Sequence, residues 1–304
     1  MADAKTFRVS GYCPVTVTPF DDSGAFVPDA FAEILQWHIT NGADGLVIGA
    51  DNGEASLLTP EDRRRMADIA VREAGGKIPV VMGAIGSHAF TADETARMVQ
   101  IAADAGVTAA LVAPTPYVGQ ASDAEVIGRF KATYDAVNLP IIAYNNPRHF
   151  GVPIEGDRLE SLMGEVDLIG IKQSSRHFLD ISKSIDRFAD RICIFMGCGY
   201  LMMPGLAMGA GGIMSTGIDL LRGDAARVTP LARAAWTEET RALHLKIGQA
   251  YTLLLETGTA PSALKAALNA IGLPAGVPRP PVHELRGAEL AALLDGLRKL
   301  GLVP

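Results

Sequence analysis

Two side chains at the ends of neighbouring apolar segments could together carry out covalent carbonyl chemistry. Lys172 closes the apolar run that begins at Asp167, which predicts a short buried strand with an amine at its carboxyl end. Burial disfavours the charged amine, so its pKa falls and the free amine becomes a nucleophile. Tyr144 lies 28 positions earlier, at the end of the preceding apolar run, where a phenol could shuttle protons for that amine. The structural alternatives are a lysine that reaches solvent and a tyrosine bonded to backbone.

A glycine-rich turn from Gly49 to Glu54 follows an earlier apolar run. Backbone N–H groups in such a turn could bind a small carboxylate, as helix N-termini and backbone nests do. Many turns after strands are rich in glycine, so the turn alone is a weak signal. Asp51 and Asn52, just before Gly53, add polar side chains that a purely structural turn does not need. We therefore expect these three residues to bind substrate.

Three histidines raise a metal-dependent alternative, because His88, His149 and His177 fall in predicted loops after strands. They lack the close or i, i+4 spacing of a recognisable ligand set. We therefore expect no metal and no cofactor.

Apolar runs of strand length alternate with amphipathic stretches of helix length along most of the chain. The runs predict strands at 12–18, 44–49, 78–83, 108–113, 140–145, 167–172, 192–196 and 211–215. Helical patterns lie between them near 28–41, 60–74, 91–105, 122–137, 155–163, 177–187 and 198–209. The strands are continuously apolar rather than alternating, which is typical of strands with both faces covered.

Eight strand–helix units favour an α/β fold, a closed (β/α)8 TIM barrel, whose active site would lie at the C-terminal ends of the strands. A doubly wound sheet is the alternative, but no GxGxxG follows the first strand and no GxxxxGK[ST] occurs. Beyond the barrel, the patterns at 223–256, 261–271 and 284–299 are helical. We predict a barrel over residues 1–222 and a C-terminal helical extension over 223–304 packed on it. A loosely linked second domain is the alternative.

The composition excludes several classes of partner. The 304 residues are 48% hydrophobic and 20% charged, as in a globular protein with a large core. A net charge of −7 argues against nucleic acid or an anionic membrane as a main partner. Three cysteines, with no CxxC pair, predict reduced thiols in a cytoplasmic protein. We see no secretory signal and no apolar run long enough to span a membrane.

The chain resembles the dihydrodipicolinate synthase/N-acetylneuraminate lyase family of class I aldolases. Four segments carry the resemblance over nearly the whole length: Val17-Thr-Pro-Phe20, Gly53-Glu54, Tyr144-Asn-x-Pro147 and Ile169-Gly-Ile-Lys172. It implies that Lys172 forms a Schiff base with pyruvate or another 2-oxo acid, that Tyr144 relays protons, and that the glycine-rich turn binds the carboxylate.

Further expectations follow from the resemblance. Met214 would line the pocket beside the bound oxo acid. Tyr117, near the family's second tyrosine, would complete a neighbour's site in a homotetramer. Asp51 and Asn52 stand where the synthases have two threonines, and His149 stands where they have the arginine that holds the second substrate's carboxylate. Arg148 is its neighbour, but we expect it to point differently.

These departures favour a Schiff-base 2-oxo-acid lyase other than the lysine-pathway synthase. Three alternatives stay open. The first is an aldolase or hydratase-aldolase that joins or splits pyruvate and an aldehyde. The second is a dehydratase or deaminase that uses the same imine on a hydroxylated 2-oxo acid or a cyclic imine. The third is a catalytically silent binding protein of the same fold.

Overall fold

Eight short parallel strands form the centre of the molecule. The structure, a computed structural model, describes residues 8–115 and 120–304. The strands are β1 (Gly11–Tyr12), β2 (Leu46–Ile48), β3 (Val80–Ala84), β4 (Ala109–Val112), β5 (Ile141–Asn145), β6 (Leu168–Gln173), β7 (Cys193–Met196) and β8 (Gly212–Ile213). Neighbours in the chain are neighbours in the sheet, and β1 pairs with β8. A parallel bridge between Val15 and Val47 joins the first segment to β2, so the sheet closes into the predicted barrel.

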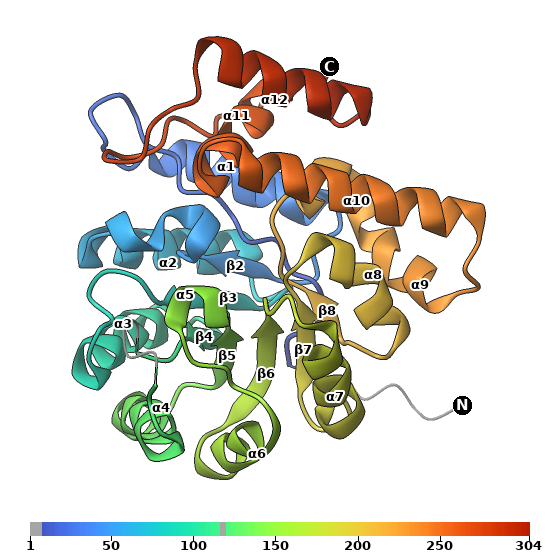
Figure 1. Ribbon diagram of the computed structural model, residues 1–304. Coiled ribbons are helices and arrows are strands. Elements are labelled where there is room, and N and C mark those ends of the chain that lie inside the picture. Colours follow the sequence, from blue (N-terminus) through green and yellow to red (C-terminus); the bar gives the residue numbers. More distant parts are fainter. Residues whose placement is uncertain (1–7, 116–119) are drawn as a thin grey trace.

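Helices follow the strands and cover the outside of the barrel (Figure 1). They are α1 (Pro28–Thr40), α2 (Pro60–Ala74), α3 (Ala92–Asp104), α4 (Asp123–Val137), α6 (Gly156–Glu165), α7 (Phe178–Phe188) and α8 (Gly199–Ala207). Thr59, Thr91 and Ser122 each cap a helix with a reciprocal capping box. Such a box satisfies two backbone donors at a helix start.

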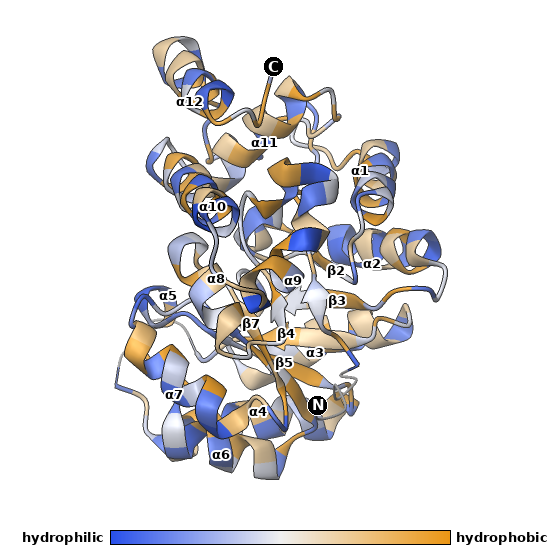
Figure 2. Cartoon of the chain, turned by 90° about the vertical axis from the view of Figure 1, so that its right-hand side faces the viewer, coloured by the Kyte–Doolittle hydropathy of each residue, from blue (hydrophilic) through white to orange (hydrophobic). Residues whose placement is uncertain are grey.

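The apolar residues of the strands point alternately to two separate cores. Val47, Val81, Leu111 and Ile142 belong to a cluster inside the barrel that also contains Tyr144. Their sequence neighbours, such as Leu46, Val80 and Ile141, belong to a larger cluster between the strands and the helices. Figure 2 shows the same pattern, with hydrophobic residues on the strands and hydrophilic ones on the outer faces of the helices. Both faces of each strand are therefore buried, which explains the continuous apolar runs.

The strand expected over 12–18 is confined to β1 (Gly11–Tyr12) and an isolated bridge at Val15. Two α-helical regions also differ from the prediction. The single helical pattern expected over 223–256 is wrong: it contains part of the 3-10 segment η3 (Ile218–Arg227), α9 (Val228–Arg233) and α10 (Glu238–Glu256). Arg222 has a φ of 55°, and Ala234 is extended, so neither can continue a helix. The other is α5 (Pro147–Phe150), which was not predicted. It is a single turn between Pro147 and a left-handed Gly151, too short to show helical periodicity.

The C-terminal helices α10, α11 (Ala260–Ala270) and α12 (Gly287–Lys299) lie beyond the barrel end to which β5 and β6 point (Figure 1). A buried ion pair joins them to the barrel, because the Lys265 ammonium of α11 contacts the Glu54 carboxylate at the end of the glycine-rich turn. The proposed division between residues 222 and 223 falls inside η3 and stays a prediction. In the described part of the chain, no helix is both long and apolar enough to cross a bilayer.

Candidate active site

Lys172 and Tyr144 lie side by side at the carboxyl ends of two paired strands. The register of β5 and β6 places Tyr144 directly opposite Lys172. The ammonium nitrogen of Lys172 lies 4.2 Å from the centre of the Tyr144 ring. Only 5% of Lys172 is exposed, and this burial lowers the pKa of its amine, although the charges of Asp51 and Cys198 act in the opposite direction. The geometry therefore gives an amine that loses its proton more readily than an ordinary lysine.

The Tyr144 hydroxyl is held by two side chains. It donates a short hydrogen bond to the Asp51 carboxylate, and the Asn146 amide donates to it at 3.1 Å. The same amide lies 3.1 Å from Nδ1 of His149. Burial raises the pKa of Tyr144 well above its usual range, and the negative charge of Asp51 raises it further. The phenol therefore stays neutral at ordinary pH, with a carboxylate ready to accept its proton.

The glycine-rich turn after β2 is fixed largely by its own bonds and by the scaffold. The Asn52 amide donates to the Val15 carbonyl at 3.0 Å, and its oxygen accepts from the Thr216 hydroxyl at 2.8 Å. The N–H of Gly53 donates to Ala50 within the turn, and Gly53 is absent from the residues that line the pocket. Asn52 and Gly53 thus hold the turn, and Asp51 is the side chain of the three that reaches Tyr144.

A fully buried arginine supports the glycine-rich turn through hydrogen bonds to backbone carbonyl oxygens. The Arg63 guanidinium donates to the carbonyl oxygens of Gly83, Ala55 and Ile85 at 2.5 to 2.8 Å. Burial lowers its pKa to about 10, so it remains charged at neutral pH. Charged hydrogen bonds to three carbonyls make this a rigid connection between the turn and the end of β3.

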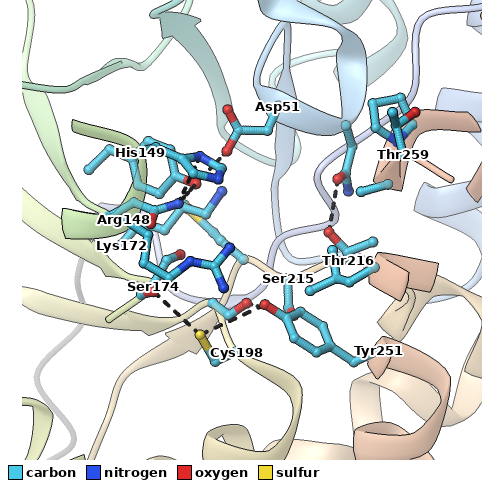
Figure 3. A pocket seen from close by; sticks show the side chains of 18 of the residues that line it. Asp51, Arg148, His149, Lys172, Ser174, Cys198, Ser215, Thr216, Tyr251 and Thr259 are labelled. Atoms are coloured by element: carbon cyan, nitrogen blue, oxygen red, sulfur yellow. Dashed lines mark hydrogen bonds between the residues drawn. The ribbon is translucent and has the colours of Figure 1, made fainter. Parts of the chain in front are cut away.

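A pocket of 560 Å³ opens above Lys172. Figure 3 shows Arg148, His149, Lys172 and Ser174 along one side, and Thr216, Tyr251 and Thr259 along the other. Its lining includes six residues singled out from the sequence: Asp51, Asn52, Tyr144, His149, Lys172 and Met214. A second pocket of 390 Å³ shares Asp51 and His149 with the first. Tyr117 lies outside the described residues.

Sequence reasoning missed part of the lining. Arg176 was not singled out, although it lies only four positions after Lys172. Arg148 was expected to point differently from the family's arginine, and the structure includes it in the lining. Cys198 and Tyr251 also line the pocket, and the Tyr251 hydroxyl lies 3.8 Å from the Cys198 sulfur. Tyr251 comes from α10, and no strand–helix pattern predicts which C-terminal helix covers a barrel.

In the described part of the chain, no set of metal-ligating side chains supports the metal-dependent alternative. His149 lines the pocket, but His177 lies on the surface with its Nδ1 3.1 Å from Asp180. Among residues 8–115 and 120–304, no three His, Cys, Asp or Glu side chains are grouped to hold a metal ion.

Comparisons with known proteins agree with this geometry. A model of the dihydrodipicolinate synthetase family matches residues 8–299. The 4-hydroxy-tetrahydrodipicolinate synthase of Methanothermobacter thermautotrophicus is 31% identical over 271 residues, which are 87% of this chain and 93% of that protein. The synthase of that name from Clostridium perfringens is 27% identical over 294 residues, covering 96% of this chain and 99% of that protein.

Solved structures show the same fold over nearly the full length. Dihydrodipicolinate synthase from Aquifex aeolicus superposes with a TM-score of 0.88 at 25% identity, covering 97% of this chain and 99% of that one. N-acetylneuraminate lyase from Fusobacterium nucleatum is 19% identical and shares the fold, with a TM-score of 0.84 over 96% of this chain and 99% of that chain. The chain therefore belongs to the dihydrodipicolinate synthetase family and is a lyase of the class I, Schiff-base aldolase type.

Proposed function

We propose that this protein joins or splits a 2-oxo acid and a second carbonyl compound through an imine on Lys172. The observation that carries the proposal is the buried Lys172 amine beside Tyr144, whose hydroxyl is bonded to the Asp51 carboxylate. A nucleophile, a neutral phenol and a base in this order form the set that imine chemistry needs.

Imine formation uses each of these groups once. The free amine of Lys172 attacks the keto carbon of pyruvate or a related 2-oxo acid, which gives a carbinolamine. The Tyr144 hydroxyl then donates its proton to the departing hydroxyl, and water leaves. In the same relay Tyr144 recovers the proton that the nitrogen loses, so no net proton is consumed. The high pKa of Tyr144 suits this role, because the phenol carries protons without remaining ionised.

Carbon–carbon bond formation begins when the imine nitrogen takes up a proton from solvent and the resulting iminium ion loses a proton from the neighbouring carbon. We propose that this proton passes through Tyr144 to Asp51, which leaves a nucleophilic enamine. The enamine adds to the carbonyl carbon of the partner, and the new alkoxide takes a proton back along the same path. Cleavage is the same sequence in reverse. Water then releases the product and restores the Lys172 amine.

The partner carbonyl compound would enter beside His149. The Nδ1 atom of this histidine lies within hydrogen-bonding distance of the Asn146 amide. The same amide donates a hydrogen bond to the Tyr144 hydroxyl. The imidazole ring can exchange a hydrogen bond with a hydroxyl on the partner. We therefore propose a hydroxylated or aromatic partner in preference to aspartate semialdehyde. The synthesis of 4-hydroxy-tetrahydrodipicolinate, which the names of the relatives state for them, is the direct competitor.

The contact between His149, Asn146 and Tyr144 also favours a second candidate, loss of water or ammonia from a longer 2-oxo acid. The imidazole could pass a proton to the leaving group after Lys172 has activated the chain. Because the family consists of lyases, the silent binding protein is not retained.

We also propose a homotetramer, in which Tyr117 completes a neighbour's site. Light scattering at assay concentration tests this oligomeric state.

One experiment separates these reactions. The purified protein is incubated with pyruvate and a panel of aldehydes that includes aspartate semialdehyde, and separately with hydroxylated 2-oxo acids, and the products are identified by mass spectrometry. Carbon–carbon products support an aldolase, and 2-oxo acids that have lost water support a dehydratase. Efficient dihydrodipicolinate formation would overturn the proposed partner and leave the imine chemistry intact.

A further inference from the structure

We propose that Arg148 and Arg176 together form an anion-binding site at the mouth of the pocket, so that the substrate carries a carboxylate or phosphate at the end remote from Lys172. This inference rests on the proposed function, because it concerns the far end of a molecule that Lys172 holds as an imine. It assigns the remote group to two side chains other than His149, which occupies the position of the family's arginine.

The fold brings the two guanidinium groups to the same side of the pocket. Arg148 lies four positions after Tyr144, and Arg176 lies four positions after Lys172. Tyr144 and Lys172 are paired in register at the ends of β5 and β6, so the segments that follow leave the barrel side by side. Both arginines line the pocket.

Neither arginine is neutralised within the described residues, where no ion pair involves Arg148 or Arg176. Other arginines of the chain have carboxylate partners, such as Arg158 with Asp123 and Arg187 with Asp157. Two neighbouring cations without counter-ions repel one another, and an anion between them would remove that cost.

The two charges converge on the same part of the pocket. Both of them lower the pKa of the Cys198 thiol, and both lower the pKa of the Tyr251 phenol, although burial raises each pKa overall. Cys198 follows β7, and Tyr251 lies on α10 across the pocket in Figure 3. Their positive fields therefore overlap at Cys198 and Tyr251, two residues of the lining of the pocket that also contains Lys172.

The acidic residues of the lining do not cancel this field. Asp51 accepts the hydrogen bond of the Tyr144 hydroxyl, and Glu54 is paired with the buried Lys265. Glu256 ends α10, next to the segment that carries Thr259 on the opposite side of the pocket. The whole chain has a net charge of −7, so a positive side in this pocket departs from the average of the protein. Guanidinium groups bind carboxylate and phosphate through paired hydrogen bonds, which makes either anion a suitable ligand.

The experiment compares 2-oxo acids of equal length that differ only at the far end. The probes are 2-oxohexanoate with a neutral tail, 2-oxoadipate with a carboxylate tail, and a 2-oxo acid of similar length with a phosphonate tail. Each is titrated with borohydride present, and the concentration giving half-maximal adduct at Lys172 is measured by peptide mass spectrometry. No turnover is needed, so the result is independent of the partner.

We expect an anionic tail to lower the half-maximal concentration by about 10- to 100-fold, the range for hydrogen bonds to a charged group. Arg148→Ala and Arg176→Ala should each remove most of this advantage, and added salt should weaken it. The better of the two anionic probes identifies the natural group. Arg286→Ala, which removes an exposed arginine paired with Glu284 outside the pocket lining, is the matched control and should keep the wild-type preference.

Pyruvate has no tail, so it distinguishes a failure of the anion-binding site from a failure of the proposed function. The wild type and Arg286→Ala should form the pyruvate adduct equally, and for each arginine variant the tail effect is measured relative to that variant's own neutral-tail probe. If the pyruvate adduct forms and tail charge has no effect, or if the preference survives both alanine variants, the anion site is wrong and the proposed function stands. If pyruvate forms no adduct at Lys172, the proposed function fails and this inference fails with it.

Discussion

Asp51→Asn should separate imine formation from turnover, because Asp51 acts on both Lys172 and Tyr144. The substitution keeps the shape of the side chain and removes its charge. In the wild type the Asp51 carboxylate accepts the hydrogen bond of the Tyr144 hydroxyl and raises the pKa of the Lys172 amine. The variant therefore loses a proton acceptor and also a charge that keeps Lys172 protonated.

The two effects have opposite signs. A hydrogen bond to a charged group contributes about 1.5–3 kcal/mol, so the loss of this acceptor should lower kcat about 10- to 100-fold. Imine formation needs the free amine, whose fraction rises with pH through the pKa of Lys172. Without Asp51 that pKa falls further, so the rate of borohydride-trapped adduct formation should reach its plateau at a lower pH than in the wild type.

The assay measures the initial rate of pyruvate adduct formation across pH, together with kcat for the substrate found in the panel. Asp224→Asn removes an exposed carboxylate on η3 that is paired with Arg227, and it should change neither profile. An Asp51→Asn variant with wild-type kcat would refute the role of Asp51 as proton acceptor. A pH profile of adduct formation shifted upward would refute the electrostatic argument.

Three further predictions concern single side chains. Tyr144→Phe should lower turnover by roughly 10²- to 10⁴-fold with an unchanged melting temperature, and near-normal kcat would make Tyr144 structural. His149→Ala should lower kcat/KM for hydroxylated substrates, because it removes the imidazole that would bond their hydroxyl. Wild-type kcat/KM for aspartate semialdehyde should be lower than for these substrates by about two or more orders of magnitude, because this aldehyde has no hydroxyl for His149 to bond. Equal values would contradict the assignment. Lys265→Met should cost about 3–5 kcal/mol of stability in urea denaturation, because it leaves the buried Glu54 charge unpaired, and a change below about 1 kcal/mol would show that water or Arg279 compensates.

The sequence predicted the barrel and the central pair of the site for simple physical reasons. Strands buried on both faces show as apolar runs, and the end of each run marks the end of a strand. Residues at two consecutive ends are neighbours in any parallel barrel, which is why Tyr144 and Lys172 could be placed together from their positions alone.

Other features of the site depend on side-chain direction, which periodicity does not contain. The bond from Tyr144 to Asp51 joins residues 93 positions apart, and Asn52 was expected to bind substrate although its amide is bonded to the scaffold. Arg148 lies on the single helical turn α5 and Arg176 on the loop after β6, and the sequence pattern leaves the course of both segments open. The side of the pocket formed by α10 depends on how the C-terminal helices pack, which an amphipathic pattern does not specify.

The central claim is that the Lys172 amine forms the covalent imine, and trapping that imine tests it most directly. The protein is treated with pyruvate and borohydride, digested, and mapped by peptide mass spectrometry, with Lys172→Ala and Lys265→Met as parallel samples. The account predicts a stable pyruvate-derived adduct on Lys172 in the wild type and no adduct in Lys172→Ala. The folded fraction of Lys265→Met should still form the adduct on Lys172. An adduct on another lysine, or turnover that continues in Lys172→Ala, would contradict the account.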